Sequence, residues 1–255
     1  MEYLACPFEY EGKDSMVAMV EEALHTDEVE VEEEEHTDVV EQEHDSGSAD
    51  EESHTDEAEH EDDPKSTWVR LPRRPSTARA LFDALPPLSG FRVEVIEGKL
   101  IVSPMGTPEH TWMAVDLNDA LSPLCKERGW RGAPGGLSVC IEGPRDSLIP
   151  DYVLTHPLCP RWGPGELLSS GVVMVAEIVS PSSVHTDREE KRRLYALGQV
   201  PVYLLIDPIA DEPSVTAFSD IKDGAYQAMT KVITGTPIKL PSPVDFKLDT
   251  SIFMA

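Results

Sequence analysis

The stretch that decides the fold is Val172-Val173-Met174-Val175-Ala176-Glu177-Ile178-Val179. This apolar run lies between Gly171 and Ser180-Pro181, and it predicts a β-strand that is buried on both faces. Glu177 interrupts the run with a carboxylate. An ionised side chain in such a place is costly unless a cation, a proton or several hydrogen bonds compensate it. We therefore take Glu177 as the first candidate functional residue.

A second carboxylate, Asp151, lies in another strand-like stretch, over residues 148–155. Pro150 within this stretch predicts an edge or a bulge, because proline cannot donate to the ladder. If the strands of Asp151 and Glu177 are neighbours, both acids can hold one Mg²⁺ or Mn²⁺, an ion that polarises a phosphoryl group. The alternatives are a turn acid for Asp151 and a buried salt bridge to an arginine for Glu177.

The other patterns along the chain predict a mixed α/β fold. The order of the core elements is helix, three strands, helix and strand, which is typical of a mixed sheet with helices on its faces. The predicted elements are a short helix over 77–85, a hairpin of strands 91–95 and 99–103, a helix from 107 to 129, strands over 137–141, 148–155 and 172–180, a helix over 186–197, a strand over 202–207, and weaker strands over 215–218, 226–232 and 237–240.

The second of the two core helices offers a cation. Lys191 has Asp187 one turn before it and Tyr195 one turn after it, all on one helix face. A lysine here can orient a water molecule and offset charge on a transferring phosphate. In the alternative arrangement Asp187 complements the helix start and Lys191 is solvated. His110, in the first turn of its helix, can bond to a ligand or simply cap or pack. Glu94, near a hairpin turn, is either exposed or a third acid of the site.

Charge is distributed very unevenly along the chain. Residues 1–65 contain 26 Asp and Glu against 2 Lys, so of the total net charge of −27 only −3 belongs to residues 66–255. We predict a disordered acidic tail over 1–65, a linker with a short helix over 66–90 and a folded domain over 91–255. The tail can bind a basic surface, including a groove of the same chain, or it can act only as a solubilising segment.

Cysteine usage and hydropathy predict a cytoplasmic protein. The four cysteines form no C-x-x-C pair, which favours reduced thiols. The N-terminus lacks a basic segment followed by an apolar one, and no run reaches the roughly 18 apolar residues of a membrane span. We therefore expect no membrane partner.

Several segments taken together resemble one family. They are Glu94-Val95-Ile96-Glu97-Gly98-Lys99-Leu100, Ser103-Pro104-Met105-Gly106-Thr107-Pro108-Glu109-His110, Pro150-Asp151-Tyr152-Val153, Val175-Ala176-Glu177-Ile178-Val179-Ser180-Pro181-Ser182-Ser183, Asp187-Arg188-Glu189-Glu190-Lys191, Tyr195-Ala196 and Val200-Pro201-Val202-Tyr203-Leu204-Leu205-Ile206-Asp207-Pro208. This combination resembles the Uma-two restriction-endonuclease family, within the PD-(D/E)XK nuclease superfamily, from about residue 90 to about residue 252.

The resemblance implies a restriction-endonuclease-like fold with a Mg²⁺- or Mn²⁺-dependent centre that hydrolyses phosphodiester bonds in DNA. Asp151 matches the first acid of the superfamily and Glu177 the acid of its E-x-K element, and both would be metal ligands. Val179 stands at the usual lysine position. Lys191 belongs to the Asp-x-x-x-Lys motif of the family and is the candidate for the catalytic cation.

The same resemblance leaves Glu94 and His110 as auxiliary catalytic residues. Because Val179 replaces the usual lysine, the alternative is a catalytically inactive binding module with the nuclease fold, regulated by the acidic tail. A homodimer is expected if both strands of a duplex are cut.

The folded domain has a net charge of −3 and therefore lacks the overall basic charge that is typical of DNA-binding domains. Local groups of arginines would have to bind the phosphates of DNA.

Overall fold

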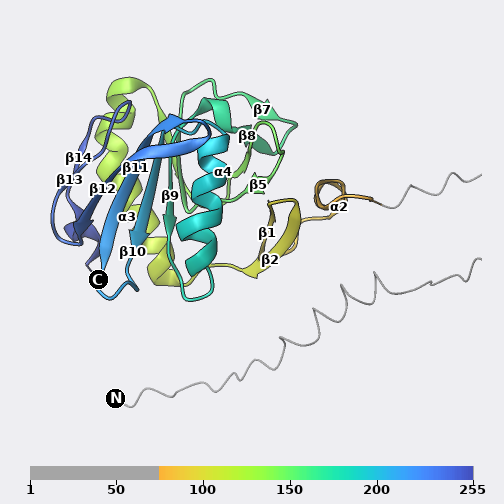
Figure 1. Ribbon diagram of the computed structural model, residues 1–255, viewed down its shortest axis with the longest axis horizontal. Helices are drawn as coiled ribbons and strands as arrows, with labels where there is room; N and C mark the ends of the chain where they lie inside the picture. Colours follow the sequence, from red (N-terminus) through yellow and green to blue (C-terminus); the bar gives the residue numbers. More distant parts are fainter. Residues whose placement is uncertain (1–74, 255) are drawn as a thin grey trace, which may run out of the picture. The chain divides into compact units, whose positions relative to one another are not determined.

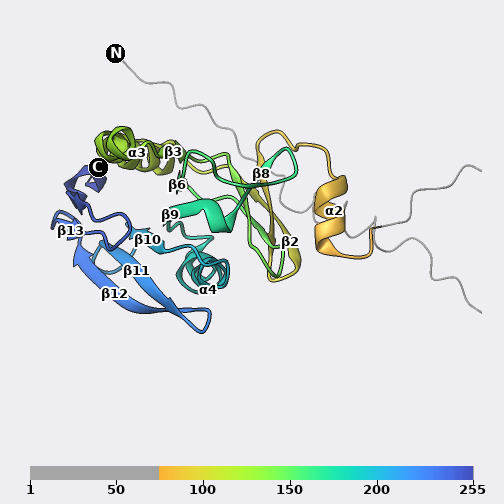
Figure 2. The same ribbon diagram turned by 90° about the horizontal axis from the view of Figure 1, so that it is seen from above.

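The structure is a computed structural model that describes residues 75–254 (Figures 1 and 2). The predicted acidic tail over 1–65 and residues 66–74 of the predicted linker segment lie outside these residues. Two six-stranded sheets and one two-stranded sheet make up the β-structure of the described part. The fold is therefore a mixed α/β fold, as the sequence predicts.

The central sheet has the strand order β12-β11-β10-β9-β6-β3. Only β9 and β10 run parallel within it, and the other neighbouring pairs are antiparallel, so this sheet is mixed. Its strands are β3 (Arg131–Pro134), β6 (Tyr152–Thr155), β9 (Val172–Ile178), β10 (Val202–Asp207), β11 (Ser214–Lys222) and β12 (Ala225–Ile233).

Strand β9 is buried along its whole length, which confirms the prediction for this stretch. Met174 and Ala176 belong to one apolar cluster, which also contains Leu117 of the long helix α3 (Pro108–Arg128). Val175 belongs to a second cluster with Leu194 of helix α4 (Arg192–Leu197). The two helices thus cover opposite faces of the central sheet, as Figure 2 shows. Glu177 alternates with Ala176 and so lies on the α4 face.

Helix α3 begins and ends where the sequence predicts. Thr107 is its N-cap, and the Thr107 hydroxyl accepts a hydrogen bond from the backbone N–H of His110. Gly129 closes the helix in the left-handed conformation, with φ of 67°. The N-cap fixes the position of the first turn, in which His110 reaches the C-terminal end of β9.

The second sheet has the strand order β2-β1-β5-β4-β8-β7, and it supplies Glu94 to the site. The predicted single strand over 148–155 is wrong, because the chain breaks at Ile149-Pro150. Ser147-Leu148 pair in this sheet, whereas Tyr152 begins β6 of the central sheet. Pro150 has no N–H for a ladder, and Asp151 therefore lies where the chain passes between sheets. The strands are β1 (Phe91–Ile96), β2 (Lys99–Pro104), β4 (Ser138–Cys140), β5 (Ser147–Leu148), β7 (Arg161–Trp162) and β8 (Glu166–Leu168).

The remaining elements are short. They are helix α2 (Ala78–Ala84), the 3₁₀ turns η1 (Ser169–Gly171) and η3 (Thr250–Phe253), the π-helical turn η2 (Thr186–Lys191), and the two-stranded sheet of β13 (Ile238–Lys239) and β14 (Lys247–Leu248). The sequence patterns predict α2, α4 and β13 but miss β3, β7, β8 and β14. Among the helices within 75–254, none has the length and apolar character needed to cross a membrane.

Candidate functional site

The two predicted acids lie side by side on one face of the central sheet. Strands β6 and β9 are antiparallel neighbours, with Tyr152 opposite Ala176. One residue beyond this pair, Asp151 comes opposite Glu177, and residues opposite each other point to the same face. Both side chains are buried and both line one pocket of about 750 Å³, which we call the acidic pocket. The condition on which the metal prediction depends, neighbouring strands, is therefore met.

Lys191 lies at the centre of a group of carboxylates. Its Nζ is 3.2 Å from Glu177 Oε1, 3.3 Å from Glu94 Oε1 and 3.6 Å from Asp187 Oδ1. The residue is only 3% exposed, so the alternative of a solvated lysine is wrong. Burial disfavours its charge, but Glu177, Glu94 and Asp187 outweigh burial and raise the pKa of Lys191 well above its ordinary value. The buried partner of Glu177 is thus this lysine.

The two oxygens of Glu177 have different surroundings. Oε1 accepts a hydrogen bond of 2.8 Å from Tyr195 Oη and is the atom that faces Lys191. Oε2 is buried and has no hydrogen-bond partner among the described residues. Burial, together with the charges of Asp151, Asp187 and Glu94, raises the pKa of Glu177 well above its ordinary value, although Lys191 acts in the opposite direction. Glu177, a residue that lines the pocket, therefore has a buried carboxylate oxygen whose hydrogen-bonding capacity is unsatisfied.

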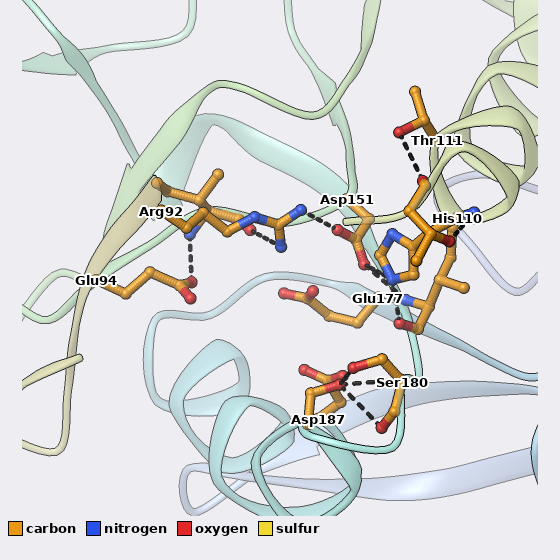
Figure 3. A network of polar contacts seen from close by, with 12 residues as sticks. Arg92, Glu94, His110, Thr111, Asp151, Glu177, Ser180 and Asp187 are labelled. Carbon is orange, nitrogen blue, oxygen red and sulfur yellow. Dashed lines mark hydrogen bonds and ion pairs between the residues drawn. The ribbon is translucent and has the colours of Figure 1, made fainter. Parts of the chain in front are cut away.

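Asp151, in contrast, is fully engaged. Its Oδ1 accepts a hydrogen bond of 2.7 Å from Arg92 Nη2, and its Oδ2 accepts one of 2.8 Å from the backbone N–H of Ile178. His110 Nε2 is 3.3 Å from the same Oδ2 and 2.6 Å from the carbonyl oxygen of Ile178. Figure 3 shows Arg92 and His110 on either side of the Asp151 carboxylate. His110 thus lines the acidic pocket, and its partners there are the Asp151 carboxylate and the carbonyl of Ile178.

Asp187 is a site residue whose importance the sequence only partly indicates. It is the second residue of the π-helical turn η2, in which Asp187 and Lys191 are the buried residues. Such π-turns are frequent at functional sites. Asp187 is 2% exposed, and its Oδ1 has no hydrogen-bond partner within residues 75–254. Burial raises the pKa of Asp187. The Asp-x-x-x-Lys motif is the sequence signal that could have identified Asp187 as a site residue.

Glu94 joins the site from β1 of the second sheet. Its Oε1 accepts a hydrogen bond of 2.7 Å from the backbone N–H of Ile149 and faces Lys191. The site is thus built from both sheets, from the start of α3 and from η2. In Figure 3, the carboxylates of Glu94, Asp151, Glu177 and Asp187 gather around one space. Even so, within 75–254 no three His, Cys, Asp or Glu side chains are already arranged as a cage for a metal ion.

A crystal structure from Anabaena variabilis, described as a putative nuclease belonging to DUF820, is similar with a TM-score of 0.53 and 21% identity over 70% of this chain and 97% of that one. The model of the Uma2 family, described as "Putative restriction endonuclease", matches residues 79–251. The chain therefore belongs to this family, and the resemblance stated above is confirmed. No curated protein matches the chain.

Proposed function

We propose that the protein is a divalent-metal-dependent nuclease that hydrolyses phosphodiester bonds in nucleic acid. Membership of a restriction-endonuclease family supports the reaction class. The observation that carries the proposal is the state of Glu177: it is fully buried, one oxygen is held by Tyr195 and Lys191, and the other is unpartnered in a pocket. A buried, unsatisfied carboxylate oxygen is costly, and a bound cation would remove that cost.

The donor set fits a hard divalent cation such as Mg²⁺ or Mn²⁺. Magnesium typically takes one or two protein carboxylates and keeps several waters. Glu177 Oε2 and Asp187 Oδ1 are buried without hydrogen-bond partners in the described part of the chain, so these two residues would hold the ion. Asp151 would be a further ligand if Arg92 releases it. When bound, such an ion polarises a phosphoryl group and lowers the pKa of bound water.

The balance of charges in the acidic pocket is also suited to binding a divalent cation. Four buried acids and the exposed Glu109 line the pocket, whereas Arg92 and Lys191 are its lysine and arginine residues among those the structure describes. The excess of negative charge matches a divalent ion. In our proposal Lys191 remains protonated and stabilises negative charge at the reacting phosphate, Glu94 and Tyr195 hold Lys191 and Glu177 in place, and His110 orients Asp151.

The position of Val179 is consistent with the role proposed for Lys191. Val179 is buried in the same apolar cluster as Leu194 and Tyr195, on the face covered by α4. A lysine from η2 reaches the carboxylate of Glu177 from the adjoining helix, 3.2 Å away. The cation at this carboxylate thus comes from Lys191, which supports the role proposed for it.

The experiment that tests the function uses Glu177→Gln, which keeps the shape of the side chain. We expect cleavage of DNA in Mg²⁺ buffer to fall by about a hundredfold or more. The melting temperature should fall only modestly, because Lys191 keeps Glu94 and Asp187 as partners and the amide oxygen can still accept the hydrogen bond from Tyr195. Glu109→Gln is the matched control, since Glu109 is an exposed acid that lines the same pocket. If Glu177→Gln cleaves as well as the unmodified protein, the proposal is wrong.

One observation favours the second candidate, a binding module without turnover. Both oxygens of Asp151 are occupied by protein donors, so the first acid of the predicted metal pair is not free. Titration with Mn²⁺ separates the two functions. An enzyme should bind Mn²⁺ in a manner that depends on Glu177 and Asp187. A module should bind nucleic acid with or without the ion.

A further inference from the structure

The mouth of the acidic pocket is walled by aliphatic side chains. Met105 is 57% exposed and Ile209 is 44% exposed, and Ile101 and Val102 of β2 are also exposed. All four line the pocket, together with prolines at 104, 181 and 208. The apolar wall is therefore continuous with the buried carboxylates at the pocket floor.

No unpaired cation accompanies this wall among the described residues. Arg92 and Lys191 line the pocket, but Arg92 is bound to Asp151 and Lys191 lies among three carboxylates. The other polar groups at the mouth are uncharged hydroxyls, apart from the exposed acid Glu109. Ser182 is exposed there, and Ser180 and Ser183 hydrogen bond to each other at 2.8 Å.

This surface does not match an intact duplex. Binding to duplex DNA depends on Lys and Arg side chains that neutralise phosphates, and a protein typically makes about 6 to 10 such contacts. A duplex also hides the faces of its bases, so an aliphatic wall has nothing apolar to contact. The pocket volume of about 750 Å³ is of the size that holds a small organic ligand. It is not the size of a groove for a helix.

We propose that the acidic pocket takes an unpaired nucleotide of a single-stranded nucleic acid, and this inference rests on the nuclease function proposed above. The base would lie against Ile101, which is opposite Glu94 in the sheet and so shares its face, and against Met105. Only an unpaired base exposes its apolar faces to such side chains. The serine hydroxyls near Ser182 would donate hydrogen bonds to a phosphate without requiring a positive charge. A single strand also needs only one active centre, so a homodimer is not required for the reaction.

Binding measurements test the preference directly. The full chain is titrated into a short labelled DNA strand, and separately into the same strand annealed to its complement, with Ca²⁺ in place of Mg²⁺. We expect the single strand to bind about tenfold more tightly or better. The dependence on salt should be shallow for the single strand, with a slope of log K against log salt of about −1, because few counterions are released.

Two variants locate the preference at the pocket mouth. Ile101→Ser and Met105→Ser should each weaken single-strand binding by several-fold and leave the melting temperature nearly unchanged, because both side chains are exposed. Leu158→Ser is the matched control, since Leu158 is 91% exposed and does not line the pocket. Binding of the single strand should be unchanged in this control.

The outcomes separate this inference from the function on which it rests. If the duplex binds as tightly as the single strand, or if Ile101→Ser and Met105→Ser bind like Leu158→Ser, the proposed substrate is wrong, whether or not cleavage is seen. If the protein prefers the single strand but cleaves neither form in Mg²⁺, the binding inference holds and the nuclease function fails.

Discussion

At the scale of single residues, the site depends on how the two oxygens of Glu177 are divided. Tyr195 and Lys191 both contact Oε1, and this leaves Oε2 free. A carboxylate without such a partner could turn its two oxygens toward either neighbour. Tyr195 is therefore a positioning residue, and its effect on metal binding can be separated from its effect on stability.

Tyr195→Phe removes only the hydroxyl that donates to Glu177. We expect the free energy of unfolding to fall by about 1.5–3 kcal/mol, because a hydrogen bond to a carboxylate is lost. We also expect Mn²⁺ affinity, measured by calorimetry, to fall by about tenfold. Tyr226→Phe is the control: its hydroxyl donates to the carbonyl of Val200, away from the acidic pocket. If both variants bind Mn²⁺ equally well, Tyr195 has only a structural role.

Arg92 holds Asp151 through a hydrogen bond of 2.7 Å, and Arg92→Met tests whether a metal ion can replace it. Breaking a buried pair should destabilise the protein by about 3 kcal/mol in chelator. Saturating Mg²⁺ should restore much of this loss, since a ligand at about 100 times its Kd contributes about 2.7 kcal/mol.

Arg188→Met provides the comparison for Arg92→Met. Arg188 pairs with Asp207 at 2.8 Å, and neither residue lines the acidic pocket. Thermal melts with and without Mg²⁺ should therefore show rescue only for Arg92→Met. Equal losses in the two conditions for Arg92→Met would mean that Asp151 takes no part in holding an ion.

At the scale of elements, the sequence predicts the helices and strands that are long or that end at a proline or glycine. It misses the very short strands. Strand β10 matches its predicted range, because Val202 to Asp207 is a continuous apolar run that ends at Pro208. The stretch 148–155 also looks like one strand, and the hydrophobic pattern cannot show that its two halves pair in different sheets. The strands missed are too short to have a period, and their pairing is set by tertiary contacts.

The residues of the candidate site also differ in how far the sequence predicts them. The position of Glu177 can be predicted because a carboxylate in an apolar run is itself a signal. Lys191 and Glu94 cannot be brought together by local patterns, since they come from η2 and from β1 of another sheet. The sequence also does not predict that η2 is a π-helical turn, because the spacing of Asp187 and Lys191 suits an α-helix equally well.

The wider turn of η2 is open to a direct test. Deleting Glu189, an exposed residue, should convert the π-helical turn to an α-helical one and shorten the spacing of Asp187 and Lys191 from four residues to three, which shifts the two side chains relative to each other. We expect a loss of Mn²⁺ affinity of about tenfold or more, with the circular dichroism of the fold retained. Glu189→Ala is the matched control, because it removes the same side chain and keeps the turn. Unchanged Mn²⁺ binding in the deletion variant would argue against Asp187 as a ligand.

At the scale of the whole molecule, charge is separated between the two parts of the sequence. Residues 1–65 carry a net charge of −24, and the remainder, which includes the family match over 79–251, carries −3. A polyanionic segment repels nucleic acid through long-range electrostatics, and salt screens that effect. Specific occupation of a binding site by the tail would also involve short-range contacts, which are screened much less.

Deleting residues 1–65 therefore distinguishes a general charge effect from autoinhibition. We expect the shortened protein to bind a labelled single strand more tightly at low salt, by several-fold. The difference from the full chain should disappear near 1 M salt, where the Debye length is about 3 Å. Fluorescence anisotropy at a series of salt concentrations measures both proteins under the same conditions. An advantage of the shortened protein that persists at 1 M salt would mean that the tail contacts the binding surface itself. Cleavage rates in Mg²⁺ should then rise in parallel, because a blocked pocket would have been opened.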